Sequence, residues 1–232
     1  MTPQPALSDS LDAALENTTT LLAWIDLAPR GINTYLAIRC PWGEESWLPL
    51  HRAAQGGHTN AVKQLLQAGA QPDSRTRFVT PMHARQTALH LAAAANHTPI
   101  ITALLDADAQ IEVRDARSRS PLWEAARAGH HHAVNLLLSA NAVIDAPDTG
   151  GRTPLHAALM PVANNTPPFN ADAALKTITA LLAAGANPNA VCPREPAGYT
   201  PLLRCVKLGK AADAIAQALR TAGADAQIMP PK

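Results

Sequence analysis

Arg152-Thr153-Pro154-Leu155-His156-Ala157-Ala158 and, further along, Leu181-Leu182-Ala183-Ala184-Gly185-Ala186 are two segments that together predict one helix–turn–helix unit. The first reads as a helix start, because a threonine hydroxyl caps free N–H groups and proline fits the first helical turn. Its paired alanines keep the helix narrow. The second ends an apolar helix with a glycine, which accepts the left-handed conformation that commonly terminates helices.

The same unit recurs along the chain. The leucine of the first segment occurs five times, with spacings of 39, 33, 33 and 47 residues, at Leu50, Leu89, Leu122, Leu155 and Leu202. The T-P-L-H-x-A-A and L-L-x-x-G-A motifs and the 33-residue period resemble the ankyrin family. The resemblance implies an all-α fold, an ankyrin-repeat solenoid of stacked helix–turn–helix units with β-turn or loop tips.

The repeats predict the domain organisation. We expect an N-terminal helical cap at 1–46, five ankyrin repeats over 47–226 and a tail at 227–232. The repeats are expected at about 47–79, 86–118, 119–151, 152–198 and 199–226. A degenerate extra repeat is the alternative for the N-terminal segment, whose expected helices around Leu11–Leu15 and Leu21–Leu27 match the pattern loosely.

Two of the spacings exceed the period by 6 and 14 residues, which predicts insertions. The first lies at 73–85, between the first two repeats. The second, at 161–172, must separate the two helices of the fourth repeat, because its prolines cannot continue either helix. A shorter excess surrounds Cys192–Pro196. Insertions in solenoids map to loops and often mark a binding face; the alternative is a tolerated surface loop.

Some motif positions carry unusual residues. Trp123 stands where the motif has histidine, and Leu203 replaces it in the last repeat. The resemblance implies that this histidine joins adjacent turns by hydrogen bonds, and we expect the indole N–H to be able to donate instead. Asn96, Asp108 and Asn141 stand where other repeats have glycine, at a small expected cost in stability.

Composition and motifs exclude several functions. A net charge of +1 and 3% aromatic residues argue against a nucleic-acid partner. No apolar run approaches the ~20 residues of a membrane span, and the start lacks a secretory pattern. We therefore expect no membrane partner and a cytoplasmic location. Three cysteines without a C-x-x-C spacing argue against a disulfide framework or a zinc site.

No catalytic motif of the G-x-S-x-G, H-E-x-x-H or P-loop type is present. Six of the nine histidines have structural explanations in the repeat: His51, His90, His156, His58, His97 and His130. His130-His131-His132 could bind a transition metal, but consecutive side chains rarely converge on one ion. We expect no enzyme activity, no cofactor and no metal site. A metal or enzyme site using His83 or these three histidines is the less favoured alternative.

The resemblance implies that a partner binds the concave side, formed by turn tips and inner helices. The variable positions expected there are Glu44, Glu45, Trp47, Gln55, His83, Gln86, Arg117, Arg119, Arg127, Arg152, Met160, Tyr199 and Lys207. Trp47 and Tyr199 are expected as aromatic anchors. The arginines, with Lys207, are expected to form a basic stripe that holds an acidic segment of the partner. The alternative is a solvated face, on which neighbouring carboxylates such as Glu124 balance the arginines.

These observations predict a non-enzymatic protein–protein interaction module that is monomeric alone and binds through its concave face and loop tips. Narrower alternatives are an immunity or antitoxin protein that neutralises a toxic enzyme, and a delivered bacterial effector. The alanine-rich composition suggests a bacterial source. A scaffold or homo-oligomer is a further alternative.

Overall fold

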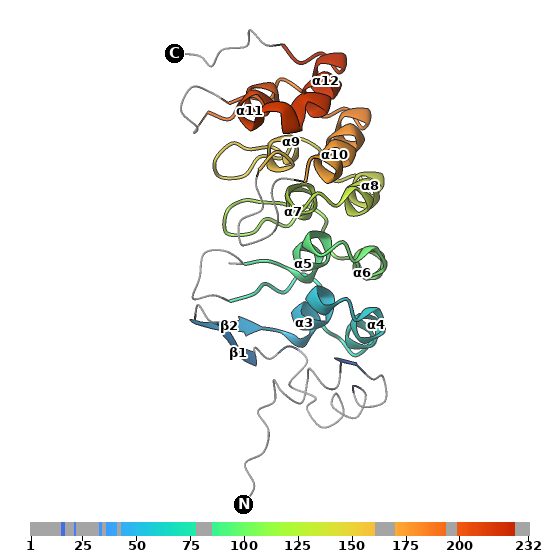
Figure 1. The fold of residues 1–232 in the computed structure, drawn as a ribbon. Helices are drawn as coiled ribbons and strands as arrows, with labels where there is room; N and C mark the ends of the chain where they lie inside the picture. The colour runs from blue at the N-terminus through green and yellow to red at the C-terminus, as the bar shows by residue number, and fades with distance from the viewer. Residues whose placement is uncertain are drawn as a thin grey trace, which may run out of the picture. The chain divides into compact units, whose positions relative to one another are not determined.

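The computed structural model describes residues 15–16, 21, 33, 36–40, 43–77, 85–160, 170–193 and 199–225. The chain divides into two units, 1–116 and 117–232. Helices in the described residues form consecutive pairs in both units (Figure 1), as the repeat pattern predicts. None of the described helices is long and apolar enough to cross a membrane.

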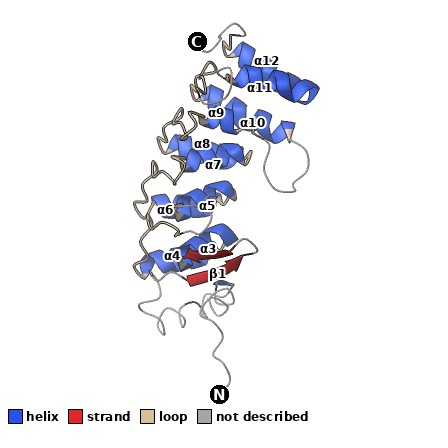
Figure 2. Ribbon diagram, turned by 90° about the vertical axis from the view of Figure 1, so that its left-hand side faces the viewer, coloured by secondary structure: helices blue, strands red, loops and turns tan. Residues whose placement is uncertain are grey.

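The described residues of the first unit include a β-hairpin and two helix pairs. Strands β1 (Leu36–Cys40) and β2 (Gly43–Trp47) are antiparallel, with Leu36 opposite Trp47. The helices are α3 (Pro49–Gly56), α4 (Thr59–Gln67), α5 (Ala88–Ala94) and α6 (Thr98–Leu105). Helix α3 packs against α4 and α5, and α6 packs against α4 and α5. Figure 2 shows the hairpin beside α3.

The second unit contains three helix pairs among its described residues. They are α7 (Pro121–Arg127) and α8 (His131–Ser139), α9 (Pro154–Ala157) and α10 (Ala171–Ala183), and α11 (Pro201–Leu208) and α12 (Asp213–Thr221). A short 3-10 helix, η1 (Gly209–Ala212), joins the last two. The insertion expected at 161–172 separates α9 from α10, the two helices of a pair, as expected, although Ala171 and Asp172 already belong to α10. Residues 161–169 themselves lie outside the described residues.

Leucines form the core of each helix pair. The five motif leucines, Leu50, Leu89, Leu122, Leu155 and Leu202, are at most 2% exposed. Their counterparts on the second helices are all 0% exposed: Leu65, Leu104, Leu137, Leu181 and Leu219. Alanines beside them are also buried, for example Ala53 and Ala54, so the helices of a pair approach closely.

Left-handed residues end the second helices. Gly69, Gly185 and Gly223 have φ of 93°, 95° and 90°. Asp108 and Asn141 occupy the equivalent positions with φ of 60° and 65°. The prediction that these two residues replace a helix-ending glycine is therefore confirmed.

The β-hairpin was not predicted, because residues 1–46 were expected to be a helical cap. Residues 36–40 and 43–47 are instead strands. Pro41 and Gly43, the first residue of β2, both disfavour a helix interior. Leu15 and Leu21 are helical, as the cap hypothesis expects, but most of that segment lies outside the described residues.

Candidate functional site

The motif histidines connect successive turns. In the second unit, the His156 ring accepts the Thr153 N–H at Nδ1, 3.3 Å away, and its Nε2 lies 3.0 Å from the Tyr199 carbonyl oxygen. Nδ1 accepts, so Nε2 carries the proton and donates to that carbonyl. His51 repeats the arrangement in the first unit, with Nε2 2.9 Å from the Ser74 carbonyl oxygen. These histidines hold loop tips in place rather than facing a ligand.

Burial keeps the His51 ring neutral. Desolvation lowers the pKa of His51 from 6.5 to about 4, although its hydrogen bond to the Ser74 carbonyl opposes the shift. The side chain is 0% exposed. A neutral ring supplies one acceptor and one donor, which are the two roles that this turn uses.

Trp123 replaces the motif histidine and keeps its function as a donor. The indole Nε1–H donates to the Arg152 carbonyl oxygen across 3.0 Å. Arg152 precedes the next helix start, as Tyr199 does in the following repeat. The expectation that the indole could supply this bond is confirmed.

In the first unit, Gln86 is not a surface residue as expected. It is 3% exposed, and its backbone pairs with Thr76: the Thr76 N–H donates to the Gln86 carbonyl (2.8 Å), and the Gln86 N–H donates to the Thr76 hydroxyl (2.9 Å). This pairing joins the chain before and after residues 78–84. His83 lies outside the described residues.

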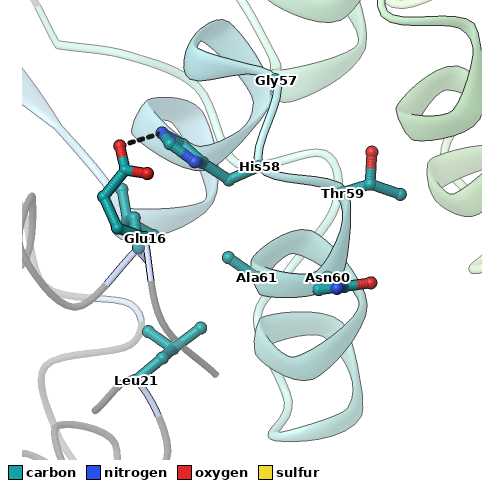
Figure 3. Close-up of a pocket in the computed structure, with 8 residues that line it drawn as sticks. Glu16, Leu21, Gly57, His58, Thr59, Asn60 and Ala61 are labelled. Atoms are coloured by element: carbon teal, nitrogen blue, oxygen red, sulfur yellow. Dashed lines mark ion pairs between the residues drawn. The ribbon is translucent and has the colours of Figure 1, made fainter. Parts of the chain in front are cut away.

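The other expected residues of the first unit are distributed over two elements. Glu44, Glu45 and Trp47 belong to β2. Gln55 is exposed near the end of α3, and its carbonyl accepts a bond from His97 Nε2 at 3.1 Å. A cavity of about 510 Å³ lies beside α3 and α4 (Figure 3), where Glu16 Oε1 is 3.9 Å from His58 Nε2.

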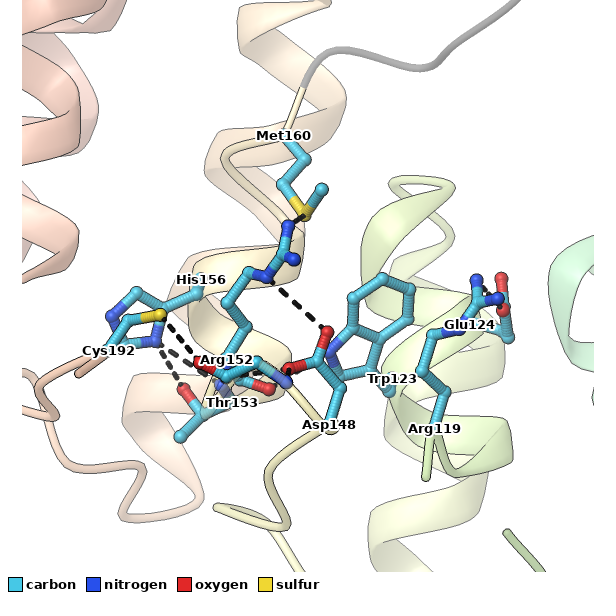
Figure 4. Close-up of polar contacts among 10 residues, drawn as sticks. Arg119, Trp123, Glu124, Asp148, Arg152, Thr153, His156, Met160 and Cys192 are labelled. Atoms are coloured by element: carbon cyan, nitrogen blue, oxygen red, sulfur yellow. Dashed lines mark hydrogen bonds and ion pairs between the residues drawn. The ribbon is translucent and has the colours of Figure 1, made fainter. Parts of the chain in front are cut away.

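In the second unit, Glu124 neutralises two arginines of the expected basic stripe. Arg119 Nη1 lies 2.6 Å from Glu124 Oε1, and Arg127 Nε lies 3.1 Å from Glu124 Oε2. Arg119 is only 6% exposed and stacks over the Trp123 ring, 5.1 Å from its centroid (Figure 4). Arg119 is therefore not exposed on the surface as expected, and its charge pairs with Glu124 inside the repeat.

Asp148 organises the turn that carries Arg152, and the sequence analysis missed it. Its Oδ1 accepts the backbone N–H groups of Gly150 (2.8 Å) and Arg152 (2.9 Å), which shapes the turn before α9. Its Oδ2 lies 3.4 Å from Arg152 Nε. An aspartate two residues before Gly-Gly was the available signal, since such side chains cap turns. Arg152 also donates to Met160 Sδ across 3.8 Å and stays partly exposed.

Tyr199 is not a projecting anchor as expected, because it is 6% exposed. Its backbone pairs with Cys192, with the Cys192 N–H donating to the Tyr199 carbonyl at 2.9 Å. Two cations cover its ring: Lys207 Nζ is 4.4 Å and Arg204 Cζ 5.7 Å from the centroid. Arg204 was not among the expected residues. We call Tyr199, Arg204 and Lys207 the Tyr199 platform.

The cations of the Tyr199 platform differ from three arginines of the expected stripe in their ion pairs with carboxylates. Within the described part of the chain, no carboxylate forms an ion pair with Arg204 or Lys207, whereas Arg119, Arg127 and Arg152 each have one. Arg117 is exposed, and its carbonyl accepts the Thr149 N–H at 2.8 Å. Lys207 is exposed and Arg204 is half-buried.

Metal-binding side chains do not gather in the described ranges, where no group of three or more histidine, cysteine, aspartate or glutamate residues could hold an ion. The His131 and His132 rings are 4.0 Å apart. Desolvation, and then the charges of His132 and Lys176, lower the pKa of His131.

Cys192 and Cys205 are buried free thiols, and Cys192 Sγ donates to the Gly150 carbonyl at 3.1 Å.

Comparison with known proteins identifies one family. The family model described as ankyrin repeats (3 copies) matches residues 12–115 and 89–190. No curated protein matches the chain.

Proposed function

Because the chain belongs to the ankyrin-repeat family, whose repeats mediate binding to other proteins, we propose that it binds a protein partner through the first-helix and loop-tip surface of residues 117–232. The Tyr199 platform carries this proposal. Its two cations, Lys207 from the expected stripe and Arg204 beside it on α11, form no ion pair with a described carboxylate.

The Tyr199 ring restricts the side chains of Arg204 and Lys207 before a partner binds. Lys207 and Arg204 lie one helical turn apart on α11, and both contact the face of Tyr199. A cation within about 6 Å of a ring centroid is attracted to it. The side chains therefore lose less conformational freedom when a partner carboxylate reaches them. Hydrogen bonds with Cys192 and His156 hold the backbone of Tyr199, and so the position of its ring, in place.

We propose that the partner presents an acidic segment to this platform. Arg127 and Arg152 extend the proposed binding surface beyond the Tyr199 platform. Their side chains are 27% and 32% exposed, and ion pairs with Glu124 and Asp148 neutralise part of their charge. Met160 adds a sulfur atom against Arg152. Complementary charge would mainly accelerate association and select the partner. The immunity-protein and delivered-effector alternatives differ from this proposal in the identity of the partner, not in the surface used.

Zero-length carbodiimide coupling tests the proposal, because it joins a lysine directly to a carboxylate in contact with it. The partner captured from the source cells is coupled to the full chain, and the cross-links are mapped by mass spectrometry. We expect cross-links from partner Asp or Glu residues to Lys207. Lys176, an exposed lysine on the second helix α10, is the matched control. Cross-links at Lys176 without any at Lys207 would contradict the proposed surface.

A further inference from the structure

Helix α11, in the last described helix pair (Figure 1), exposes an apolar side chain at a position that is buried in the other repeats. Val206 lies four residues after the motif leucine Leu202 and is 69% exposed. The residues four positions after the other motif leucines are all 0% exposed: Ala54, Ala93, Ala126 and Leu159. The same position is therefore covered in four repeats and open in the fifth.

Leu203 belongs to the same face of α11, because it occupies the position that contacts the following turn in earlier repeats. His51, Trp123 and His156 stand there and donate a ring N–H to the carbonyls of Ser74, Arg152 and Tyr199, respectively. Leucine has no such donor, and Leu203 is half-buried. We call Leu203 and Val206 the α11 apolar face.

Earlier first helices use the equivalent face to pack a helix of the next repeat. Helix α3 packs against α5, and α7 packs against α9. Terminal repeats of solenoids normally present a polar outer face, which keeps the array soluble. An exposed valine beside a leucine departs from that rule. The α11 apolar face therefore has the chemistry of a surface on which a further helix packs.

Two cations lie beside the α11 apolar face. Arg204 and Lys207 each directly follow one of its residues, so they form a neighbouring stripe on the same helix. Neither forms an ion pair with a described carboxylate, and residues 201–212 contain a third cation, Lys210, but no acidic residue. A complementary helix therefore carries apolar side chains beside Asp or Glu.

The same charges disfavour a second copy of the chain as the occupant. A symmetric dimer uses one patch on both copies, so Arg204 and Lys207 of one copy would face those of the other. Like charges that face each other oppose association. An acidic partner is attracted by the charges that keep two copies apart.

From this face and its charges we infer that the partner presents an amphipathic α-helix, whose apolar side chains pack on Leu203 and Val206 and whose carboxylates reach Arg204 and Lys207. The inference rests on the proposed function, because it specifies the form of the acidic segment that meets the Tyr199 platform. An acidic loop would contact the platform without covering Val206. A helix covers both, as the first helix of a following repeat does elsewhere in the chain.

Nuclear magnetic resonance of the labelled full chain tests the inference with three synthetic peptides. Each has about 15 residues, a length at which an isolated helix becomes marginally stable. The first has leucines along one helical face and glutamates beside them; the second replaces the leucines with alanine, and the third replaces the glutamates with lysine. We expect the first to bind about 10-fold more tightly than either of the others and to shift the Val206 methyl resonances. The Val143 methyls, at a residue 51% exposed, should not shift.

A substitution on the α11 apolar face provides an independent measurement. Val206→Asp puts a charge where apolar side chains should pack, so the first peptide should bind about 10-fold more weakly. Val143→Asp makes the same change at the other exposed valine and should alter binding by less than about 2-fold. Circular dichroism should show unchanged helix content in both variants, since both valines are exposed.

The three peptides separate failure of this inference from failure of the proposed function. Equal affinity of the leucine and alanine peptides would overturn the inference and leave the Tyr199 platform in place. Equal affinity of the glutamate and lysine peptides, or no binding by any of the three, would contradict both. Light scattering of the free chain covers the remaining occupant: a dimer that Val206→Asp dissociates would assign the α11 apolar face to a second copy and overturn the inference.

Discussion

At Trp123, an indole N–H makes the bond that a histidine makes in the following repeat. The donor was predictable from the sequence, because both side chains carry a ring N–H at the same motif position. The structure adds that the bond reaches the Arg152 carbonyl and that Trp123 is 2% exposed. A single buried residue therefore sets the position of the next turn.

Removing this donor should destabilise the second unit. Trp123→Phe keeps an aromatic ring but leaves the Arg152 carbonyl without its bond, so we expect a loss of about 1–3 kcal/mol in the free energy of unfolding. Chemical denaturation measures the difference. Trp123→His, which restores the motif residue, should cost less than Trp123→Phe; a larger loss for histidine would show that the indole volume matters more than the bond.

Acid should destabilise the first unit through His51. The pKa of His51 is about 4 in the folded protein, below its ordinary value of 6.5, because the ring is buried. The unfolded chain takes up the proton first, so this stabilisation is complete above pH 6.5 and is lost as pH falls towards 4. The loss amounts to roughly 3 kcal/mol. The difference in unfolding free energy between the original protein and His51→Gln should shrink over this window; a constant difference would contradict the account.

Glu124 is the residue at which the sequence analysis fell short. Glu124 was recognised only as one carboxylate that could balance the arginines, but it pairs with both Arg119 and Arg127 and is 2% exposed. The backbone of Gln86 pairs with Thr76, that of Tyr199 pairs with Cys192, and Arg119 pairs with Glu124. The sequence pattern does not reveal these contacts or the burial of the three residues.

We expect Glu124→Gln to cost about 3–5 kcal/mol, because it leaves the buried Arg119 guanidinium without its carboxylate. Glu112→Gln is the matched control: its pair with Arg114 is about one-third exposed, so the cost should stay below about 1 kcal/mol. Thermal unfolding of both variants gives the comparison. Equal losses would mean that Glu124 does not hold a buried charge network.

Among the elements, the helix pairs follow from the sequence and the hairpin does not. Helix starts and helix-ending residues have local chemistry that is visible in the motif. A two-stranded hairpin is marginal by itself and depends on neighbouring structure. Residues 36–47 therefore gave no clear signal for a hairpin.

Helix ends offer a direct way to increase stability. Asp108 and Asn141 have positive φ without being glycine, which costs roughly 1–2 kcal/mol per residue for an ordinary side chain and less for Asp or Asn. Asp108→Gly and Asn141→Gly should each raise the unfolding free energy by up to about 1 kcal/mol. Gly185→Ala, where an added Cβ meets no atom within 4 Å, should lower it by about 1 kcal/mol through backbone strain alone. Destabilisation by both glycine variants would contradict this explanation.

For the molecule as a whole, the sequence predicts the family because the repeat places the same motif at regular intervals, and the family match agrees. The binding surface was less predictable. The expected stripe contains arginines that Glu124 and Asp148 neutralise, and the Tyr199 platform depends on a stacking contact between a loop and α11. The proposed binding surface therefore depends mainly on Arg204 and Lys207.

The dissociation constant of the identified partner, measured by calorimetry for two charge-reversed double variants, tests that claim most directly. Arg204→Glu with Lys207→Glu should weaken binding by more than about 10-fold, since each reversed contact replaces attraction with repulsion. Lys176→Glu with Arg220→Glu makes the same charge change at exposed positions on α10 and α12 and should alter binding by less than about 3-fold. Equal affinities for the two double variants would contradict the proposed binding surface.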